Sequence, residues 1–379
     1  MSVEKIVKII EGDAPGKRTE LTYFKIGTPA PRKVFLQAAL HADEQPGILI
    51  LHHLLDYLIA AERQGLLNAQ FVVFPMVNPL GMGDIGFLQH QGRYDRSSGV
   101  NFNRQWPDLY TALEDSIGDY LTDKAEDNVQ RVRELVEHWL NEQQPMNALQ
   151  WQRHYVMLEA FDADYVLDLH CDSDSLPHIF TIPPSTTLMQ SLSDWMGAAA
   201  TLVCEASGGS SFDEVWSTLW SRLAQQFPDK PIPQATHSAT LEYRGQFDTF
   251  DELNQQDAQH LYAFFQTQGL IGGELILPLP EKTPAASELA ATEMIKTPQA
   301  GLLAYTVALG QYVHKGDVIA ELISLEGEGA FQERTPITAG TSGIVLSRNT
   351  FKYVWRGATV AKIVGTEPLP SRGKYLLQD

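Results

Sequence analysis

Cysteine is scarce in this sequence, with only Cys171 and Cys204 among 379 residues. Two cysteines cannot form the disulfide framework of a small secreted protein, so we expect a reducing compartment, the cytoplasm. Long apolar runs are also missing, because no stretch approaches the ~18 consecutive apolar residues of a membrane-spanning helix. Lys5 and Lys8 interrupt the apolar N-terminus, which therefore indicates a strand and not a signal peptide.

Basic residues are in short supply. The chain has 28 Lys and Arg against 47 Asp and Glu, which gives a net charge of −19. This balance argues against binding to the phosphates of nucleic acids and to anionic membrane surfaces, since both need clustered basic residues. The Gly-x-Ser-x-Gly motif of many serine hydrolases is absent as well.

Strands and helices alternate along most of the chain. Apolar runs predict strands at 34–41, 71–77, 165–170, 178–182, 202–205 and 240–243, and periodic segments predict helices at 46–65, 185–200, 212–227 and 251–268. Pro46 near the start and Gly65 just past the end support the first helix. This alternation predicts a three-layer α/β/α domain with a largely parallel or mixed sheet.

Composition divides the chain further. We expect a first domain at 1–276 with a helical, acidic insertion at about 106–164, a Pro- and Ala-rich linker at 277–292 and a second domain at 293–379. Between Asp108 and Asp164 there are 13 acidic and 4 basic residues. We interpret the insertion as a solvated helical face, with a lid or a subunit contact as the alternative.

The second domain contains an internal repeat. Thr297-Pro-Gln-Ala-Gly301 is echoed by Thr335-Pro-Ile-Thr-Ala-Gly340, and Val313-x-x-Gly316-x-x-Ile319-Ala320 by Val354-x-x-Gly357-x-x-Val360-Ala361. Two similar halves predict a small pseudo-symmetric all-β unit, and this one resembles the barrel-sandwich fold of biotinyl and lipoyl carriers. Those carriers modify a lysine between the halves. No lysine occurs between Lys315 and Lys352, so we expect a structural or gating role.

Two clusters contain side chains that can bind a metal. His41 and Glu44 follow a predicted strand three residues apart, and His170 ends another strand. Zinc accepts imidazole nitrogen and carboxylate oxygen, and a catalytic site keeps one position for water. Open α/β sheets place their sites at the carboxyl ends of strands. Each cluster alone is also compatible with ordinary structural histidines.

Two further segments offer groups for substrate and proton transfer. Asn103-Arg104 lies in a Gly-containing segment, and a guanidinium can grip a carboxylate with two parallel hydrogen bonds; Arg93 and Arg96 lie just upstream. Glu242 has apolar neighbours, and a partly buried carboxylate with a raised pKa can act as a general base. The structural alternatives are ordinary surface arginines and a glutamate paired with a cation such as Arg244.

The order of these four clusters resembles the zinc carboxypeptidase superfamily. Together with the linker and C-terminal β domain, it resembles the succinylglutamate desuccinylase/aspartoacylase family over residues 34 to about 365. The resemblance implies a carboxypeptidase-like catalytic domain that binds one Zn²⁺ per chain. It implies that the metal ligands are His41, Glu44 and His170, that Glu242 is the general base, that Asn103 and Arg104 hold a substrate carboxylate, and that Arg93 or Arg96 polarises the scissile carbonyl.

The sequence departs from the family pattern at three points. Asn101 replaces an aspartate that supports a zinc-binding histidine. The spacing fits either Arg93 or Arg96. Between Arg222 and Arg244 there is no arginine, whereas acylaspartate-cleaving members carry one there. The last departure argues against N-acetylaspartate and succinylglutamate as substrates.

These observations predict a zinc-dependent deacylase, an amidohydrolase that cleaves a linear amide of an N-acyl amino acid or a related small molecule. The alternatives are a metallocarboxypeptidase acting on short peptides and a metal-free binding or scaffold protein that kept the fold. Neither nucleic acid nor membrane is an expected partner, and the sequence leaves open whether the chain forms a homo-oligomer.

Overall fold

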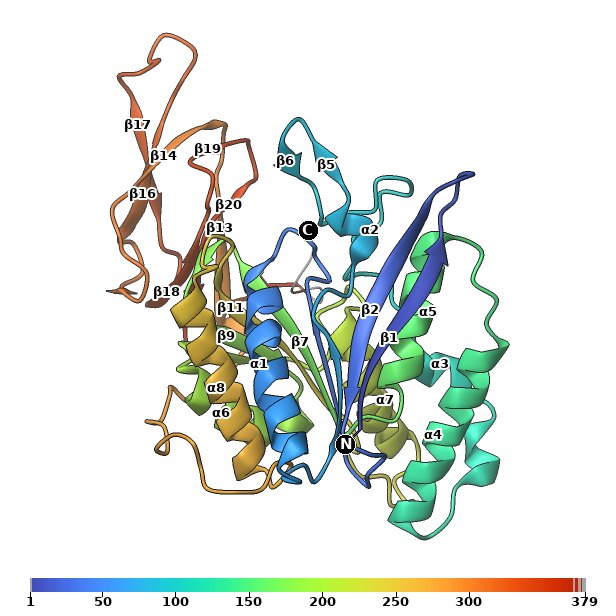
Figure 1. Ribbon diagram of the computed structural model, residues 1–379. Coiled ribbons are helices and arrows are strands. Elements are labelled where there is room, and N and C mark those ends of the chain that lie inside the picture. Colours follow the sequence, from blue (N-terminus) through green and yellow to red (C-terminus); the bar gives the residue numbers. More distant parts are fainter. Residues whose placement is uncertain (1, 371, 374–375, 377–379) are drawn as a thin grey trace.

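The computed structural model describes residues 2–370, 372–373 and 376. A nine-stranded sheet with helices on both faces forms the larger part of the molecule, and two small antiparallel sheets form its C-terminal part (Figure 1). The predicted α/β class with a mixed sheet and a C-terminal all-β unit is confirmed.

Parallel strands occupy the centre of the large sheet. Neighbouring strands β4, β3, β7 and β11 run parallel, whereas β1–β2, β2–β4 and β11–β9 are antiparallel pairs. The sheet is therefore mixed, and its spatial order is β1 (Val3–Glu11), β2 (Arg18–Ile26), β4 (Gln70–Phe74), β3 (Lys33–Ala38), β7 (Tyr165–Asp172), β11 (His237–Gly245), β9 (His178–Thr181), β10 (Ala200–Val203) and β12 (Ser287–Glu288).

The central strands bury both faces, as their continuous apolar sequences require. In β3, Val34 and Leu36 enter one hydrophobic core and Phe35 enters the other. One core is covered by α1 (Pro46–Arg63), α6 (Thr186–Met196) and α8 (Asp251–Thr267), and the opposite core by α3 (Leu109–Leu113), α4 (Ala125–Glu142), α5 (Ala148–Ala160) and α7 (Phe212–Gln226) (Figure 1).

The acidic insertion supplies part of this second helical layer. Val132, Val136 and Leu140 of α4 are buried in the same core as Phe35 of β3. The charges occupy the outer face of α4, which gives the helix a polar and an apolar side. Residues 106–164 therefore cover the sheet, and they include the short 3₁₀ helix Ile117–Tyr120.

The C-terminal β unit, residues 292–364, confirms the predicted pseudo-symmetry. One sheet has the order β13 (Thr292–Lys296), β20 (Thr359–Val364), β18 (Gly343–Arg348), β15 (Tyr312–Val313), and the other β17 (Arg334–Thr338), β16 (Val318–Ile323), β14 (Gly301–Tyr305), β19 (Tyr353–Val354). The repeat makes β13, β14, β15 and β16 the counterparts of β17, β18, β19 and β20. Replacing each strand of one sheet by its counterpart gives the strand order of the other sheet. Gly316 and Gly357 occupy equivalent turns with φ of 97° and 83°, a backbone conformation that favours glycine.

Short elements connect these parts. Before the helical insertion lie α2 (Pro79–Met82) and the hairpin of β5 (Ile85–Gly86) and β6 (Gln89–His90), and the 3₁₀ turns are Pro183–Ser185 and Leu289–Ala291. β8 (Asp174–Ser175), which directly follows β7, pairs with β18 and so joins the large sheet to the β unit. β12 lies within the predicted linker, whose boundaries stay a prediction. No helix in the described part of the chain is long and apolar enough to cross a membrane.

Candidate active site

The candidate residues converge at one edge of the large sheet. His41 and Glu44 lie in the loop between β3 and α1, His170 lies near the end of β7, and Glu242 lies beside His170 on the neighbouring strand β11. Because β3, β7 and β11 are parallel, their carboxyl ends meet at the same edge. Ala39, with φ of +57°, turns the chain sharply after β3 and leads into His41.

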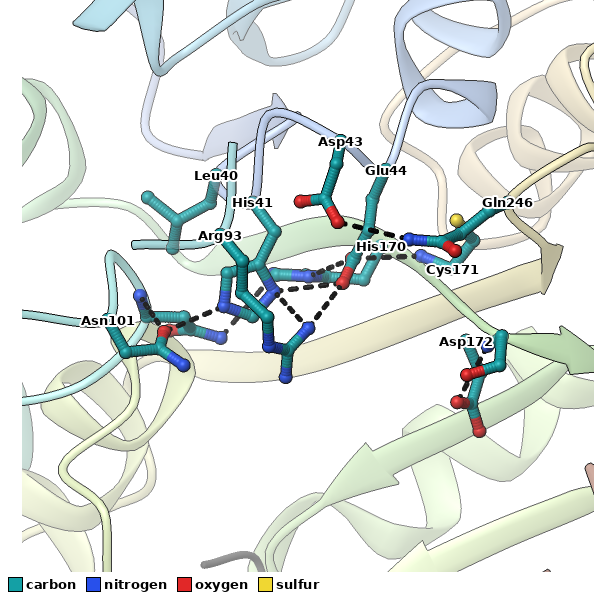
Figure 2. A network of polar contacts seen from close by, with 12 residues as sticks. Leu40, His41, Asp43, Glu44, Arg93, Asn101, His170, Cys171, Asp172 and Gln246 are labelled. Carbon is teal, nitrogen blue, oxygen red and sulfur yellow. Dashed lines mark hydrogen bonds and ion pairs between the residues drawn. The ribbon is translucent and has the colours of Figure 1, made fainter. Parts of the chain in front are cut away.

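Glu44 lies between the two histidines (Figure 2). Its Oε1 is 2.9 Å from His41 Nδ1 and its Oε2 is 2.7 Å from His170 Nδ1. All three side chains are buried, and each offers one ligand atom within 4.8 Å of the others. The structure therefore brings together the three residues that the sequence predicted as metal ligands.

The second nitrogen of each imidazole has its own partner. His41 Nε2 is 2.8 Å from Asn101 Oδ1, and His170 Nε2 is 2.9 Å from Asp168 Oδ2. Such outer contacts fix the ring orientation, because the hydrogen on Nε2 leaves Nδ1 free to bind a metal. Asp168 and His170 alternate on β7, so both side chains lie on the same face. Asn101 accepts its hydrogen bond through a neutral amide oxygen, whereas Asp168 offers a carboxylate.

Burial and mutual attraction shift the pKa values of the three candidate ligands in different directions. Burial alone would raise the pKa of Glu44, but His41 and His170 hold it well below the usual range. Burial opposes protonation of His170, yet Asp168 and Glu44 raise its pKa well above 6.5. Burial lowers the pKa of His41. Two imidazoles and one carboxylate in a buried site that lines a cavity are a donor set that fits a zinc ion.

The two upstream arginines have different surroundings. Arg93 Nη1 lies 3.0 Å from Glu44 Oε1 and 3.3 Å from His41 Nδ1, and its side chain lines the cavity. Arg96 does not line this cavity; its Nη2 pairs with Asp84 at 2.8 Å and its side chain is 65% exposed. The structure thus brings Arg93, and not Arg96, to the candidate metal ligands.

Asn103 and Arg104 line the same cavity. Asn103 Oδ1 accepts a hydrogen bond of 2.8 Å from the backbone N–H of Phe212, so the loop is tied to the start of α7. Arg153 of α5 braces it from the other side by donating to the backbone oxygens of Phe102 and Arg104. The loop is therefore held by two helices.

Glu242 does not form the ion pair with Arg244 that the sequence analysis considered as an alternative. Among the described residues, no hydrogen bond reaches its Oε2, which is buried. Burial and the nearby Glu44 raise the pKa of Glu242 to about 8. Arg244 pairs instead with Asp257 of α8. A carboxylate with a raised pKa beside the candidate metal ligands is chemically suited to exchange a proton with a substrate.

The β unit also contributes to the cavity. Lys362 of β20 donates a 2.6 Å hydrogen bond to Asp172 Oδ2 at the end of β7, and both residues line the cavity together with Glu242. The cavity has a volume of about 220 Å³. This is smaller than the roughly 300–1,000 Å³ of a pocket for a drug-sized ligand.

Sequence reasoning missed several lining residues, namely Asp172, Lys362, Asp213 and Glu214. The contact between Asp168 and His170 could have been predicted, because Asp-x-His on a strand places both side chains on one face. The position of Lys362 could not have been predicted from the sequence, because it depends on how the β unit packs against the large sheet.

The chain resembles known proteins in sequence and in fold. Residues 30–214 match the catalytic domain of succinylglutamate desuccinylase/aspartoacylase. None of the curated proteins is significantly similar in sequence.

Solved structures cover nearly the whole chain. A succinylglutamate desuccinylase/aspartoacylase family protein of Shewanella amazonensis has a TM-score of 0.82 at 21% identity, covering 95% of this chain and 98% of that one. A second member, from Shewanella frigidimarina, has a TM-score of 0.81 at 19% identity, and the match covers 96% of this chain and 97% of that one. The product-bound ectoine utilization protein EutE (DoeB) of Ruegeria pomeroyi has a TM-score of 0.67 at 16% identity, with 96% and 95% covered. At these identities the likeness establishes the fold, including the β unit.

Proposed function

Because the chain belongs to the succinylglutamate desuccinylase/aspartoacylase family, we propose that it is a zinc-dependent deacylase that hydrolyses the amide bond of an N-acyl amino acid or a related small amide. The single observation that carries the proposal is the arrangement of His41, Glu44 and His170, with their donor atoms within 4.8 Å of one another at the cavity wall. Three protein ligands with a fourth position open to a cavity are typical of catalytic zinc.

Zinc bound there would supply a Lewis acid that lowers the pKa of water and polarises the amide carbonyl. Glu242 would accept a proton from the attacking water and return it to the leaving nitrogen. A bond forms between the water oxygen and the acyl carbon, and the C–N bond breaks, so that a carboxylate and an amine result. Arg93 would donate hydrogen bonds to the carbonyl oxygen as negative charge develops on it.

Substrate binding is assigned to Asn103 and Arg104, which would hold the free carboxylate beside the scissile amide. A fork of guanidinium hydrogen bonds fixes the orientation of a carboxylate as well as neutralising it. The cavity of about 220 Å³ favours a small amide over a peptide chain. The free thiols of Cys171 and Cys204 support the proposed cytoplasmic location.

Metal analysis combined with amine release tests this function. Protein purified without chelator should contain about one zinc per chain, and a panel of N-acyl amino acids should yield a free amine that stoichiometric chelation abolishes. His170→Ala should lose both zinc and activity, since three protein ligands cannot spare one. His138→Ala is the matched control, because His138 lies on the outer face of α4 with its side chain 70% exposed. Full zinc occupancy in His170→Ala, or no hydrolysis of any panel member by zinc-loaded protein, would contradict the proposal.

A further inference from the structure

Three titratable side chains form one row across the large sheet. Glu242 of β11 lies directly opposite His170 of β7 on one side and directly opposite His178 of β9 on the other. In an antiparallel pair such as β11 and β9, opposite residues point to the same face of the sheet, with Cβ atoms about 4.5–5.5 Å apart. His170 is a candidate metal ligand and Glu242 is the proposed general base, but the proposed mechanism gives His178 no role.

One hydrogen bond fixes the tautomer of His178. The side chain is fully buried, and its Nδ1 lies 2.9 Å from the backbone oxygen of Leu176. A carbonyl oxygen only accepts hydrogen bonds, so Nδ1 carries the hydrogen of the ring. Burial lowers the pKa of His178 to about 4, although the nearby Asp172 opposes this shift. The imidazole is therefore neutral, and its Nε2 presents an unprotonated lone pair.

That lone pair and one oxygen of Glu242 are both buried and both unpaired within the protein. Across the described residues, no hydrogen bond reaches His178 Nε2 or Glu242 Oε2. Buried polar atoms are nearly always hydrogen-bonded, to protein or to an ordered water. Because the two residues are direct neighbours across the strands, a single bridging group can serve both atoms.

Lys362 of the β unit is the third polar group at this position. Its ammonium has three hydrogens, and the 2.6 Å hydrogen bond to Asp172 uses one of them. Burial opposes the charge of Lys362, and attraction to Asp172 and then to Glu242 raises its pKa. Lys362 in turn contributes to the lowered pKa of His178. The ammonium is thus close to both groups whose buried atoms are unpaired.

His178 lies behind the wall of the cavity and not on it. Phe180, two residues further along β9, lines the cavity, and its ring meets the His178 ring edge-on with centroids 5.2 Å apart. His178 itself does not line the cavity. A substrate in the cavity therefore does not touch His178, which can act on the reaction only through Glu242.

We propose that one buried water molecule links Glu242 Oε2 to His178 Nε2 and Lys362 Nζ, and that His178 is thereby a positioning residue for the general base. This inference rests on the proposed function, which assigns proton transfer to Glu242. The water donates one hydrogen to Nε2 and the other to Oε2, and it accepts one from Nζ, the three contacts typical of a buried water. The carboxylate is then held with its other oxygen, Oε1, toward the attacking water. The proton passes from that water to Oε1 and on to the leaving nitrogen, while the bridging water keeps both of its hydrogens.

Two substitutions of His178 separate the two ring nitrogens. The side-chain oxygen of glutamine can replace Nε2 as an acceptor, whereas the amide nitrogen of asparagine can replace Nδ1 as the donor to Leu176. His178→Gln should therefore keep kcat within about threefold of the wild type, and His178→Asn should lower it about tenfold or more, because the general base is misplaced. KM, zinc content and circular dichroism should change little in either variant. A purely structural role depends on the bond to Leu176 and predicts the reverse order of kcat.

His237 provides the matched control. It lies at the opposite end of the same strand as Glu242, bonds through Nδ1 to Ser185 Oγ at 2.9 Å and does not line the cavity. His237→Gln and His237→Asn should both keep the wild-type kcat, which separates the contact at Glu242 from a general effect of replacing a histidine in this sheet.

A crystal structure of the zinc-loaded wild type, at a resolution that shows ordered waters, gives a readout independent of activity. We expect one water within about 3.2 Å of both His178 Nε2 and Glu242 Oε2. The absence of this water, the reverse order of the two His178 variants, or equal kcat in both of them would overturn the inference. If the wild type hydrolyses no N-acyl amino acid, the proposed function fails, and the crystal structure then decides on the water bridge by itself.

Discussion

Lys362 of the β unit donates a 2.6 Å hydrogen bond to Asp172 at the carboxyl end of β7, so a residue from each part of the chain meets at the candidate active site. Burial opposes both charges. Their attraction nevertheless raises the pKa of Lys362 and lowers the pKa of Asp172. The side chains are 18% and 14% exposed, so the pair is largely shielded from water.

Lys362→Met should therefore destabilise the protein. The substitution keeps the length of the side chain but leaves the Asp172 charge buried without its partner, which typically costs about 3–5 kcal/mol. Denaturant unfolding measures the loss. Lys296→Met, at an exposed position of the same β unit, should change the free energy of unfolding little. The double variant Asp172→Asn/Lys362→Met should recover much of the stability, and a double variant as unstable as the single one would contradict the ion-pair explanation.

Asn101 and Asp168 allow a paired test of how zinc affinity is set. Asn101→Asp places a carboxylate behind His41 Nε2 and should tighten zinc binding by about tenfold, since a charged acceptor makes the imidazole a better donor. Asp168→Asn should weaken zinc binding by about 10- to 100-fold for the converse reason. Competition against a chromogenic chelator gives both affinities. Unchanged affinity in both variants would show that these outer contacts do not tune the metal.

Glu242→Gln tests the general base. The amide is nearly isosteric and cannot accept the proton of water, so kcat should fall by about 10²- to 10⁴-fold. Zinc content and thermal stability should stay close to those of the wild type, because Glu242 is not among the proposed ligands. A kcat near the wild-type value would remove Glu242 from this role.

The parallel strands explain why part of the site was predictable. His41, Glu44, His170 and Glu242 are far apart in sequence, yet each follows or ends an apolar run, and parallel strands bring such positions to one edge. The repeat in the β unit was equally readable, because its turn glycines recur at matching positions. Both inferences depend on local patterns that the fold preserves.

Other features depend on packing between distant segments. The Lys362–Asp172 contact requires β20 to be docked against β7, which no local pattern encodes. The choice between Arg93 and Arg96 depends on a loop whose backbone reverses within a few residues. Arg244, two residues after Glu242, has a left-handed backbone with φ of 62° and pairs with Asp257 of α8, a distant contact that the sequence pattern does not encode.

Arg93 and Arg96 form a matched pair for testing stabilisation of the carbonyl. Arg93→Ala should lower kcat/KM by about 10²- to 10³-fold, the usual cost of removing one donor to a developing oxyanion. Arg96→Ala should stay near the wild type, because the Arg96 side chain is 65% exposed, pairs with Asp84 and does not line the cavity. Steady-state kinetics on the same substrate decides the assignment, and the reverse order of effects would move the role to Arg96.

Arg104 is proposed to receive the carboxylate next to the scissile amide. Arg104→Lys retains the charge but cannot form two parallel hydrogen bonds, so kcat/KM should fall. Arg104→Ala should lose more, since removing one partner of a charge-assisted pair costs on the order of 2–5 kcal/mol. The guanidinium also donates a hydrogen bond of 2.8 Å to the backbone oxygen of Asn103, so Arg104 could instead have a structural role in the loop.

Amidation of the substrate carboxylate separates these two roles of Arg104. If the guanidinium binds the carboxylate, amidation should harm the wild type strongly and Arg104→Ala little, because both changes remove the same contact and their effects do not add. If Arg104 only braces the loop, the variant should lose stability, and free and amidated substrates should suffer equally. Measuring kcat/KM for both enzymes with both substrates gives the four values of a double-mutant-style cycle, with amidation as the second change. Additive losses would assign Arg104 to the loop and require another group, on a different wall of the cavity, to receive the carboxylate.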